Sequence, residues 1–287
     1  MNKIENNILK KNILLTMKIV LTDKQKVQQF ACILRHLKNI SSNIEMVVYP
    51  TNLYVQGMDG THASLFEIYL NESWFAEYEV KKQYNLGINC ELVFRILNCL
   101  DETQNIKLEY DQGDHLYITL YPREGEQSIV KEFQLPLVMM DNDILCIPDT
   151  DYSVDLKMVS SEFSDLIDQL SIFGQELLVK CNDEKIEMTG QGDMGKMKAV
   201  IKEQDILIYA IEENTTIELS FGMNFVKDFS TFSKVNKAMN IHWSENVPMK
   251  IEYSLDEAID DDDDDVSDIS GATNYVRFYL APKIEDS

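Results

Sequence analysis

The sequence repeats itself at an offset of about 133 residues, and this internal repeat constrains the fold more than any other feature. Gly57 meets Gly190, and the strand-like pair Leu53 and Val55 meets Ile186 and Met188. The apolar set Phe30, Ile33, Leu34, Leu37 and Ile40 returns as Phe163, Leu166, Ile167, Leu170 and Phe173. The repeated unit has the length of a domain and is much longer than a solenoid repeat. The sequence therefore predicts a duplicated domain.

Each half shows the pattern of two helices and several antiparallel strands. From Phe30 the apolar residues recur at helical spacing, after a segment from Thr22 that contains a candidate N-cap. Asn89 is predicted to cap a second helix that extends to about residue 100. Alternating stretches predict strands near residues 17–21, 44–49, 53–58, 64–70, 76–81, 106–110, 116–121 and 129–135.

The second half repeats this order. Helices are predicted over residues 160–173, with Ser160 or Ser161 as N-cap, and over 223–232. A last strand is predicted over 276–281. Because each helix is apolar on one side only, the fold class is α+β, with two helices packed on one face of antiparallel sheets in each domain.

We therefore divide the chain into a domain over residues 17–132, a connector over 133–150 and a second domain over 151–287. The second domain contains an acidic insertion at about 254–274, and residues 1–16 are predicted to be a loose extension without the features of a secretory signal. No apolar run is long enough to span a bilayer, so no membrane partner is predicted. The five cysteines show no CxxC spacing and predict buried or half-buried thiols in an intracellular protein.

The net charge of −23 argues against general binding of nucleic acid. Nine acidic residues lie between positions 256 and 268, and the remainder of the chain is still acidic. We expect the aspartate run to form a solvated loop. Any contact with DNA must come from a local basic surface.

Few residues point to catalysis. Asp59 and His62 could form an acid–base or metal pair, but no third ligand is nearby and the repeat copy has neither group. The acids in and next to the connector could bind a cation or could be solvated: Asp141, Asp143, Asp149 and Asp151. Nucleotide-binding, zinc-protease and serine-hydrolase motifs are absent from the sequence. The sequence predicts a protein that is not an enzyme and has no metal or cofactor.

Leu145 and Ile147 are apolar residues of the connector, framed by Pro136 and Pro148. They could fasten the connector onto a domain, or they could line a groove for a partner peptide. The residues themselves leave both interpretations open.

Four segments resemble the proliferating cell nuclear antigen family, the eukaryotic-type DNA sliding clamps. They are LYVQGMDGTHASL, DILCIPDTDYS, NVPMKIEY and the C-terminal NYVRFYLAPKIEDS, the most specific of the four. The resemblance extends from about Met17 to the end, and the sequence is similar to a divergent or viral member of the family. It implies a nuclear protein, or one at a viral replication site.

This resemblance implies a homotrimeric ring in which the helices line a central hole and the sheets lie outside. Double-stranded DNA passes through the hole, and the ring tethers a DNA polymerase as a processivity factor; a clamp loader is an implied partner. The family's lining corresponds here to five basic residues: Lys38, Arg95, Lys227, Lys234 and Lys237. The subunit contact would pair the strand near 129–135 with one near 194–202, head to tail.

The family's groove for client peptides corresponds to three regions of this chain, near the first repeat's hairpin, the connector and the C-terminus. The residues concerned are Met58, His62, Leu65, Leu145, Ile147, Pro248, Tyr279, Ala281, Pro282 and Ile284. Replication and repair proteins would insert an aliphatic and two aromatic side chains there.

The chain departs from the family at the expected inner surface. Ala31 and Cys32 stand where the family has lysines, and Asp165 and Asp168 stand where it has arginines. The hole should therefore be less positive than is usual. Two alternatives follow: a monomeric or dimeric clamp-fold protein that binds DNA on one face, or an acidic interaction scaffold that does not encircle DNA.

Overall fold

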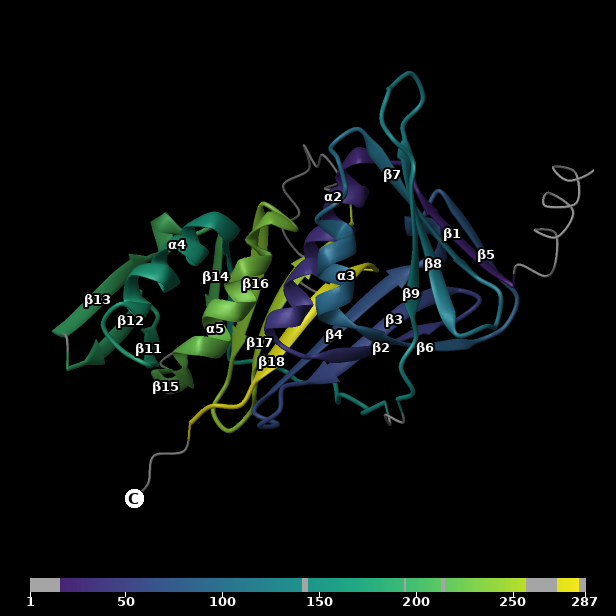
Figure 1. Cartoon of the computed structure of the whole chain (residues 1–287). Coiled ribbons are helices and arrows are strands. Elements are labelled where there is room, and N and C mark those ends of the chain that lie inside the picture. The colour runs from purple at the N-terminus through teal and green to yellow at the C-terminus, as the bar shows by residue number, and fades with distance from the viewer. Residues whose placement is uncertain (1–15, 141–143, 194, 213–214, 257–272, 284–287) are drawn as a thin grey trace, which may run out of the picture. The chain divides into compact units, whose positions relative to one another are not determined.

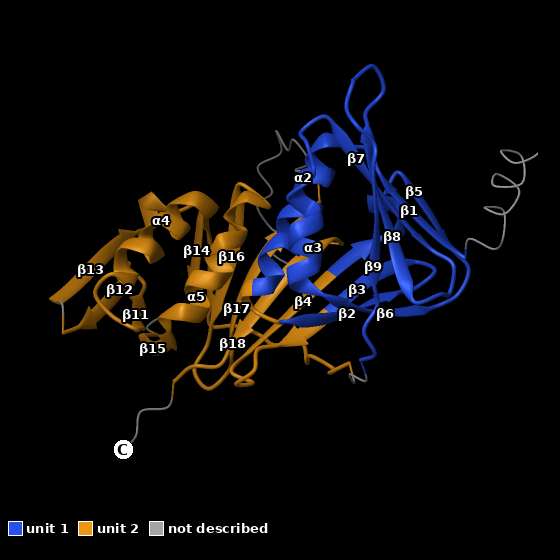
Figure 2. Ribbon diagram, in the orientation of Figure 1, with its two compact units in different colours: residues 1–38, 42–55, 69–142 blue, residues 39–41, 56–68, 143–287 orange. Residues whose placement is uncertain are grey.

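A computed structural model describes residues 16–140, 144–193, 195–212, 215–256 and 273–283. The chain forms two compact units, coloured separately in Figure 2. Unit 1 comprises residues 1–38, 42–55 and 69–142, and unit 2 comprises 39–41, 56–68 and 143–287. Residues 52–71 form a hairpin that is divided between the units. Residues 56–68, which include its turn, belong to unit 2, and its two ends belong to unit 1. No helix among the described residues is both long and apolar enough to cross a membrane.

Unit 1 contains a five-stranded antiparallel sheet in the order β5-β1-β7-β8-β9 (Figure 1). Its strands are β5 (Glu77–Val80), β1 (Met17–Leu21), β7 (Gln104–Tyr110), β8 (His115–Pro122) and β9 (Lys131–Pro136). Alternation places Leu108, Leu116 and Ile118 on the buried side, and β9 ends the sheet with one unpaired edge.

The hairpin consists of β3 (Asn52–Met58) and β4 (Ser64–Asn71). β3 is followed in the sheet by β2 (Asn43–Val48) and then by β6 (Tyr84–Asn89). The sequence analysis did not predict β6. The connector starts beside this strand, where the Val138 amide donates to the Gly87 carbonyl at 2.9 Å. A Cβ at position 87 would lie 2.1 Å from the Val138 oxygen, so glycine permits this close approach.

Two helices, α2 (Lys24–His36) and α3 (Cys90–Leu97), pack against each other and against the sheets of unit 1. The Asp23 side chain caps α2 by accepting from the Lys26 amide. Asn89 caps α3 by accepting from the Leu92 amide, as the sequence predicted. Helix α3 ends at Leu97, earlier than predicted, because the chain turns there toward β7.

Unit 2 repeats these elements. Five of its strands follow the order β14-β10-β16-β17-β18 as part of a nine-stranded sheet, and a separate four-stranded sheet has the order β13-β12-β11-β15. The first set is β14 (Ile208–Ile211), β10 (Val154–Val159), β16 (Ala238–Trp243), β17 (Met249–Ser254) and β18 (Tyr275–Leu280). The second set is β13 (Gly195–Lys202), β12 (Lys185–Gly192), β11 (Glu176–Asn182) and β15 (Ile217–Gly222). The matching orders confirm the predicted duplication.

The helices of unit 2 are α4 (Ser160–Ser171) and α5 (Met223–Ser230), and they also pack side by side. Helix α4 begins at Ser160, and Val159 is its N-cap, without a side-chain hydrogen bond. The prediction of a serine cap was therefore wrong; Ser160 is fully buried and already helical. The core of this unit includes Phe229 stacked on Phe278, with ring centroids 4.6 Å apart.

Candidate interaction surfaces

The turn between β3 and β4 is held by the Asp59 side chain. Its Oδ1 accepts hydrogen bonds from the Ser64 amide at 2.6 Å and the Ser64 hydroxyl at 3.1 Å. Its Oδ2 accepts from the Thr61 amide at 2.7 Å and from the Thr61 hydroxyl. His62 lies on the exposed side of the turn with a φ of 60°. Both carboxylate oxygens are thus engaged in holding the turn, as a structural role requires.

The pH dependence of stability should reflect this role. Burial raises the pKa of Asp59, but hydrogen bonds from Thr61 and Ser64 outweigh it and leave the pKa below its ordinary value. Because the folded-state pKa is lowered, the stabilisation is present above the unfolded pKa and is lost as pH falls through the folded one. We expect Asp59→Ala to lower the free energy of unfolding by about 1–2 kcal/mol near neutral pH.

Urea unfolding of the variant and the unchanged chain at neutral and acidic pH measures this difference. His62→Asn is the matched control, because asparagine tolerates the positive φ and the His62 side chain is exposed. A destabilisation by Asp59→Ala that stayed constant into acid would contradict this role of the carboxylate.

The connector is fastened to the same hairpin by one side chain. The Gln56 amide donates to the Leu145 carbonyl at 2.9 Å and accepts from the Leu145 amide at 2.7 Å. This pair of bonds fixes the backbone of residue 145 while its side chain stays 46% exposed. Ile147 is half-buried. The connector is therefore fastened, and it still presents an apolar side chain to solvent.

The C-terminal strand β18 and the residue after it also contact the β3–β4 hairpin. The Ala281 amide donates to the Ala63 carbonyl at 3.0 Å, and the Tyr279 hydroxyl donates to Glu67 at 2.9 Å. Burial and the neighbouring Glu67 charge both raise the pKa of Tyr279, so its hydroxyl remains a donor. Pro248 precedes β17, whose Met249 pairs with Leu280. The hairpin, the connector and β18 thus converge within unit 2.

Nine of the ten residues predicted for the partner groove lie in or next to the segments that make these contacts. Met58, Leu65, Ile147, Tyr279 and Pro282 are half-buried, whereas His62, Leu145, Pro248 and Ala281 are exposed. Ile284 lies outside the described residues. We call this set of nine residues the connector surface.

Gln56, Glu67 and Arg277 support the connector surface, and the sequence analysis missed them. Arg277 is only 23% exposed and forms ion pairs with Glu252 and, at 3.5 Å, with Glu67. Burial lowers the pKa of Arg277, but Glu252 more than offsets this, so the pKa is raised overall. The only sequence signal was the alternation of β18, in which Tyr275, Arg277 and Tyr279 share one face.

Among the predicted DNA-facing residues of unit 1, both cations lie beside Glu91. The Arg95 Nε is 3.0 Å from Glu91 Oε1, and the Lys38 Nζ is 4.0 Å from Glu91 Oε2. Lys38 also lies over the Phe94 ring, 3.2 Å from its centroid. The Glu91 carboxylate on α3 therefore pairs with Arg95 of its own helix and with Lys38, which follows α2.

In unit 2, Lys227 on α5 lies 3.1 Å from Asp168 on α4 and donates to Ser171 at 3.2 Å. Lys234 and Lys237 follow α5 and are exposed, and neither has an ion-pair partner among the described residues. The exposed residues of α4 include Glu162, Asp165 and Asp168, and that helix has no basic residue. The surface of α4 is therefore acidic.

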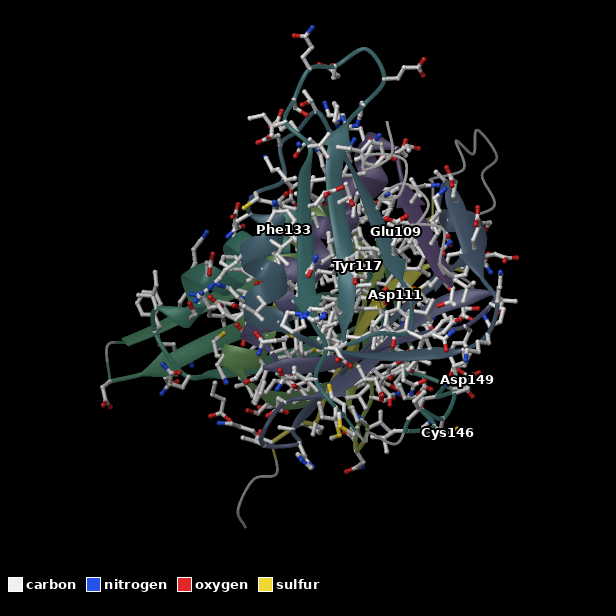
Figure 3. All side chains as sticks on the ribbon, turned by 45° about the vertical axis from the view of Figure 1, so that its right-hand side comes forward. Glu109, Asp111, Tyr117, Phe133, Cys146 and Asp149 are labelled. Carbon is white, nitrogen blue, oxygen red and sulfur yellow. The ribbon has the colours of Figure 1, made fainter. Side chains whose placement is uncertain are left out.

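β9 and β13 each lie at the end of a sheet in the described part of the chain. β9 pairs on one side with β8, and β13 pairs on one side with β12. Figure 3 shows Phe133 on β9 and Tyr117 on β8. Ile129 and Val130, just before β9, are 78% and 53% exposed, and Val200 on β13 is 48% exposed. Unpaired strand edges of this kind can add a strand from another chain.

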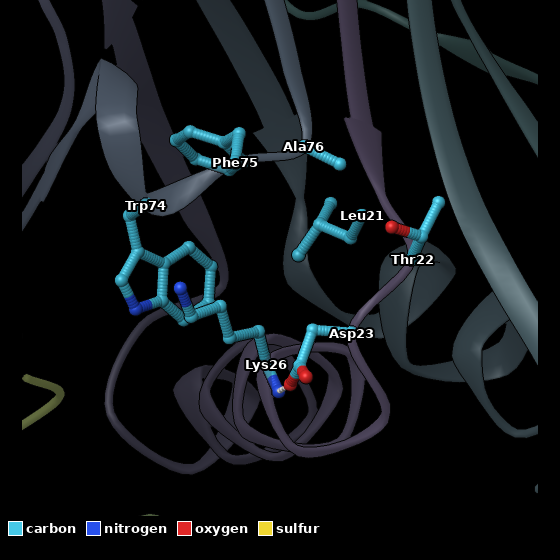
Figure 4. A pocket seen from close by; sticks show the side chains of 7 residues that line it. All are labelled: Leu21, Thr22, Asp23, Lys26, Trp74, Phe75 and Ala76. Carbon is cyan, nitrogen blue, oxygen red and sulfur yellow. Dashed lines mark hydrogen bonds between the residues drawn. The ribbon is translucent and has the colours of Figure 1, made fainter. Parts of the chain in front are cut away.

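One pocket among the described residues is too small for a typical small ligand. This pocket of roughly 100 Å³ lies at the start of α2 in unit 1 (Figure 4), smaller than typical ligand sites. Its lining consists of Leu21, Thr22, Asp23, Lys26, Trp74, Phe75 and Ala76. Within the described residues no three His, Cys, Asp or Glu side chains form a group that could hold a metal ion. Asp141 and Asp143 of the connector, like the aspartate run at 260–265 and the N-terminal extension, lie outside those residues.

The five cysteines are free thiols. Cys32, Cys90 and Cys181 are buried, as predicted, and burial raises the pKa of the Cys90 and Cys181 thiols to about 12 and about 11. Cys99 and Cys146 are exposed, which corrects the prediction for these two.

Comparison with known proteins assigns both halves of the chain. The model of the proliferating cell nuclear antigen N-terminal domain matches residues 12–145, and that of the C-terminal domain matches 146–260. The proliferating cell nuclear antigen of Dictyostelium discoideum is 26% identical over 261 residues, which cover 88% of this chain and 95% of that protein. The crystal structure of the Entamoeba histolytica protein of the same name has a TM-score of 0.79 at 20% identity. That likeness covers 94% of this chain and 100% of the other and shows the shared fold. The chain therefore belongs to the proliferating cell nuclear antigen family of sliding clamps, whose members are not enzymes.

Proposed function

We propose that three copies of this chain form a ring that encircles double-stranded DNA and acts as a polymerase processivity factor. The main observation in its favour is the repeated domain, in which a pair of helices packs on the sheets of each unit, with β9 and β13 each at the end of a sheet. The domains of the subunit are residues 17–132 and 151–287, joined by the connector 133–150.

The subunit contact joins β9 of one copy to β13 of the next, head to tail. Such a contact satisfies the unpaired backbone groups of both strands. It also covers Ile129, Val130 and Val200, whose exposure is unusual for large aliphatic side chains. A head-to-tail contact uses two different surfaces and therefore closes into a ring only if its rotation permits.

The helices face the DNA, and the contact with phosphates is electrostatic and independent of sequence. Lys38, Arg95 and Lys227, with Lys234 and Lys237, supply the positive charge. Enclosure retains the ring on DNA, so this contact need not be tight.

The connector surface binds client proteins of replication and repair, including a DNA polymerase. Two observations favour it: an exposed Leu145 on a fastened backbone, and a half-buried Tyr279 held by Glu67. Apolar side chains on rigid backbone provide the preformed site that a short helical peptide requires. A clamp loader and a nuclear location are proposed from the family alone.

Retention on closed DNA tests the proposal. The chain is dissociated by dilution, mixed with a nicked circular duplex, concentrated, and separated by gel filtration at high salt. We expect co-elution with the circle and release when the circle is cut. Equal retention on circular and linear DNA would instead favour the monomeric or dimeric protein that binds one face.

A further inference from the structure

Each unit has one helical carboxylate that pairs with basic residues of its helix region. In unit 1, Glu91 on α3 reaches Arg95 and the Lys38 beyond α2. In unit 2, Asp168 on α4 reaches Lys227 on α5. Three of the five predicted DNA-facing cations are therefore in ion pairs within their own chain.

These pairs are exposed. Glu91 and Asp168 are 49% and 59% exposed, and Arg95 and Lys227 are 69% and 49% exposed. Exposed ion pairs contribute little to stability, because water screens both charges. The effect of these carboxylates should therefore appear in what the surface binds, more than in how well the chain folds.

A phosphate that approaches Lys38, Arg95 or Lys227 meets a carboxylate within a few ångströms of the same cation. The cation cannot then bind phosphate without sharing its charge, and the carboxylate repels the phosphate directly. Lys234 and Lys237 have no such partner among the described residues and keep their full charge.

We propose that Glu91 and Asp168 are the residues that limit the affinity of the helix surface for duplex DNA. They neutralise its basic side chains and keep the contact weak enough for sliding. This inference rests on the proposed function, because it takes the helices as the DNA-facing side.

Binding of the full chain to a short fluorescent linear duplex, followed by anisotropy over a salt series, measures the effect. Glu91→Gln and Asp168→Asn should each raise the affinity about three- to tenfold at low salt and steepen its salt dependence by about one unit of slope. The double variant should show the sum of the two changes in slope.

Glu218→Gln is the matched control. Glu218 is 54% exposed and lies 3.0 Å from Lys180, but both residues are on strands, β15 and β11, and neither is on a helix. It changes the net charge by the same amount, so it isolates the effect of position. Thermal unfolding of each variant confirms that the fold is retained.

An increase confined to the two helix variants supports the inference. Equal increases in all three variants would overturn it, because net charge alone would then explain the result. No increase in the helix variants would also overturn it. In that case Lys38→Ala and Lys227→Ala test whether the helix surface binds DNA at all. Weaker binding by these variants would support the proposed DNA-facing surface, and unchanged binding would contradict it.

Discussion

A chain with alanine at both positions 145 and 147 is expected to lose binding of client peptides by about 30-fold or more while it assembles normally. The Leu145 side chain is an exposed apolar group of the connector, and Ile147, two residues later, is half-buried. Buried apolar anchors at the centre of an interface typically contribute about 2 kcal/mol or more each. The double change removes two of them and leaves the Gln56 bonds to the connector backbone in place.

The measurement is titration of a synthetic peptide that has one aliphatic and two aromatic anchor residues. Leu207→Ala is the matched control, because Leu207 is also an exposed leucine, at 56%, but lies before β14 and outside the connector surface. Unchanged peptide affinity in the double variant would show that the connector surface is not the client site.

Replacing Arg277 by methionine is expected to lower the free energy of unfolding by about 3–5 kcal/mol. Glu252 and Glu67 are only 4% and 8% exposed, and the guanidinium of Arg277 forms an ion pair with each of them. Methionine keeps much of the side-chain volume, so the effect isolates the loss of charge. The variant removes the cation that forms ion pairs with both of these buried carboxylates.

Urea unfolding at one fixed protein concentration measures the change, since assembly also adds to apparent stability. Lys180→Met is the matched control, because its partner Glu218 is 54% exposed and the change should stay below about 1 kcal/mol. Similar values for the two variants would contradict the inference that the charge of Arg277 stabilises the buried carboxylates, including Glu67, which binds Tyr279.

Most of the fold could be predicted from periodicity. The repeat aligns α3 with α5 without a gap. The Asn89 cap could be predicted because asparagine is a preferred N-cap residue, and this preference depends only on local sequence. Strand β6 was missed because its sequence, Tyr84–Asn89, is short, polar at Asn85 and interrupted by Gly87. The Ser160 cap failed because burial places that serine one position inside the helix.

The candidate sites were predictable only in part. The Glu91 and Arg95 pair lies four positions apart on one helix and could be foreseen, whereas Lys38 and Glu91 meet through packing of α2 on α3. Likewise Gln56 and Leu145 are 89 residues apart, and nothing local in the sequence joins them. Contacts of this kind form through tertiary packing, and the spacing of residues along the sequence does not predict them.

The mass of the purified chain in solution, measured by light scattering at physiological salt over a range of concentrations, tests the central claim most directly. The account predicts a stable species of about three times 33.2 kDa, formed by β9 and β13 of neighbouring copies. A monomer of 33.2 kDa at every concentration would contradict a preformed ring.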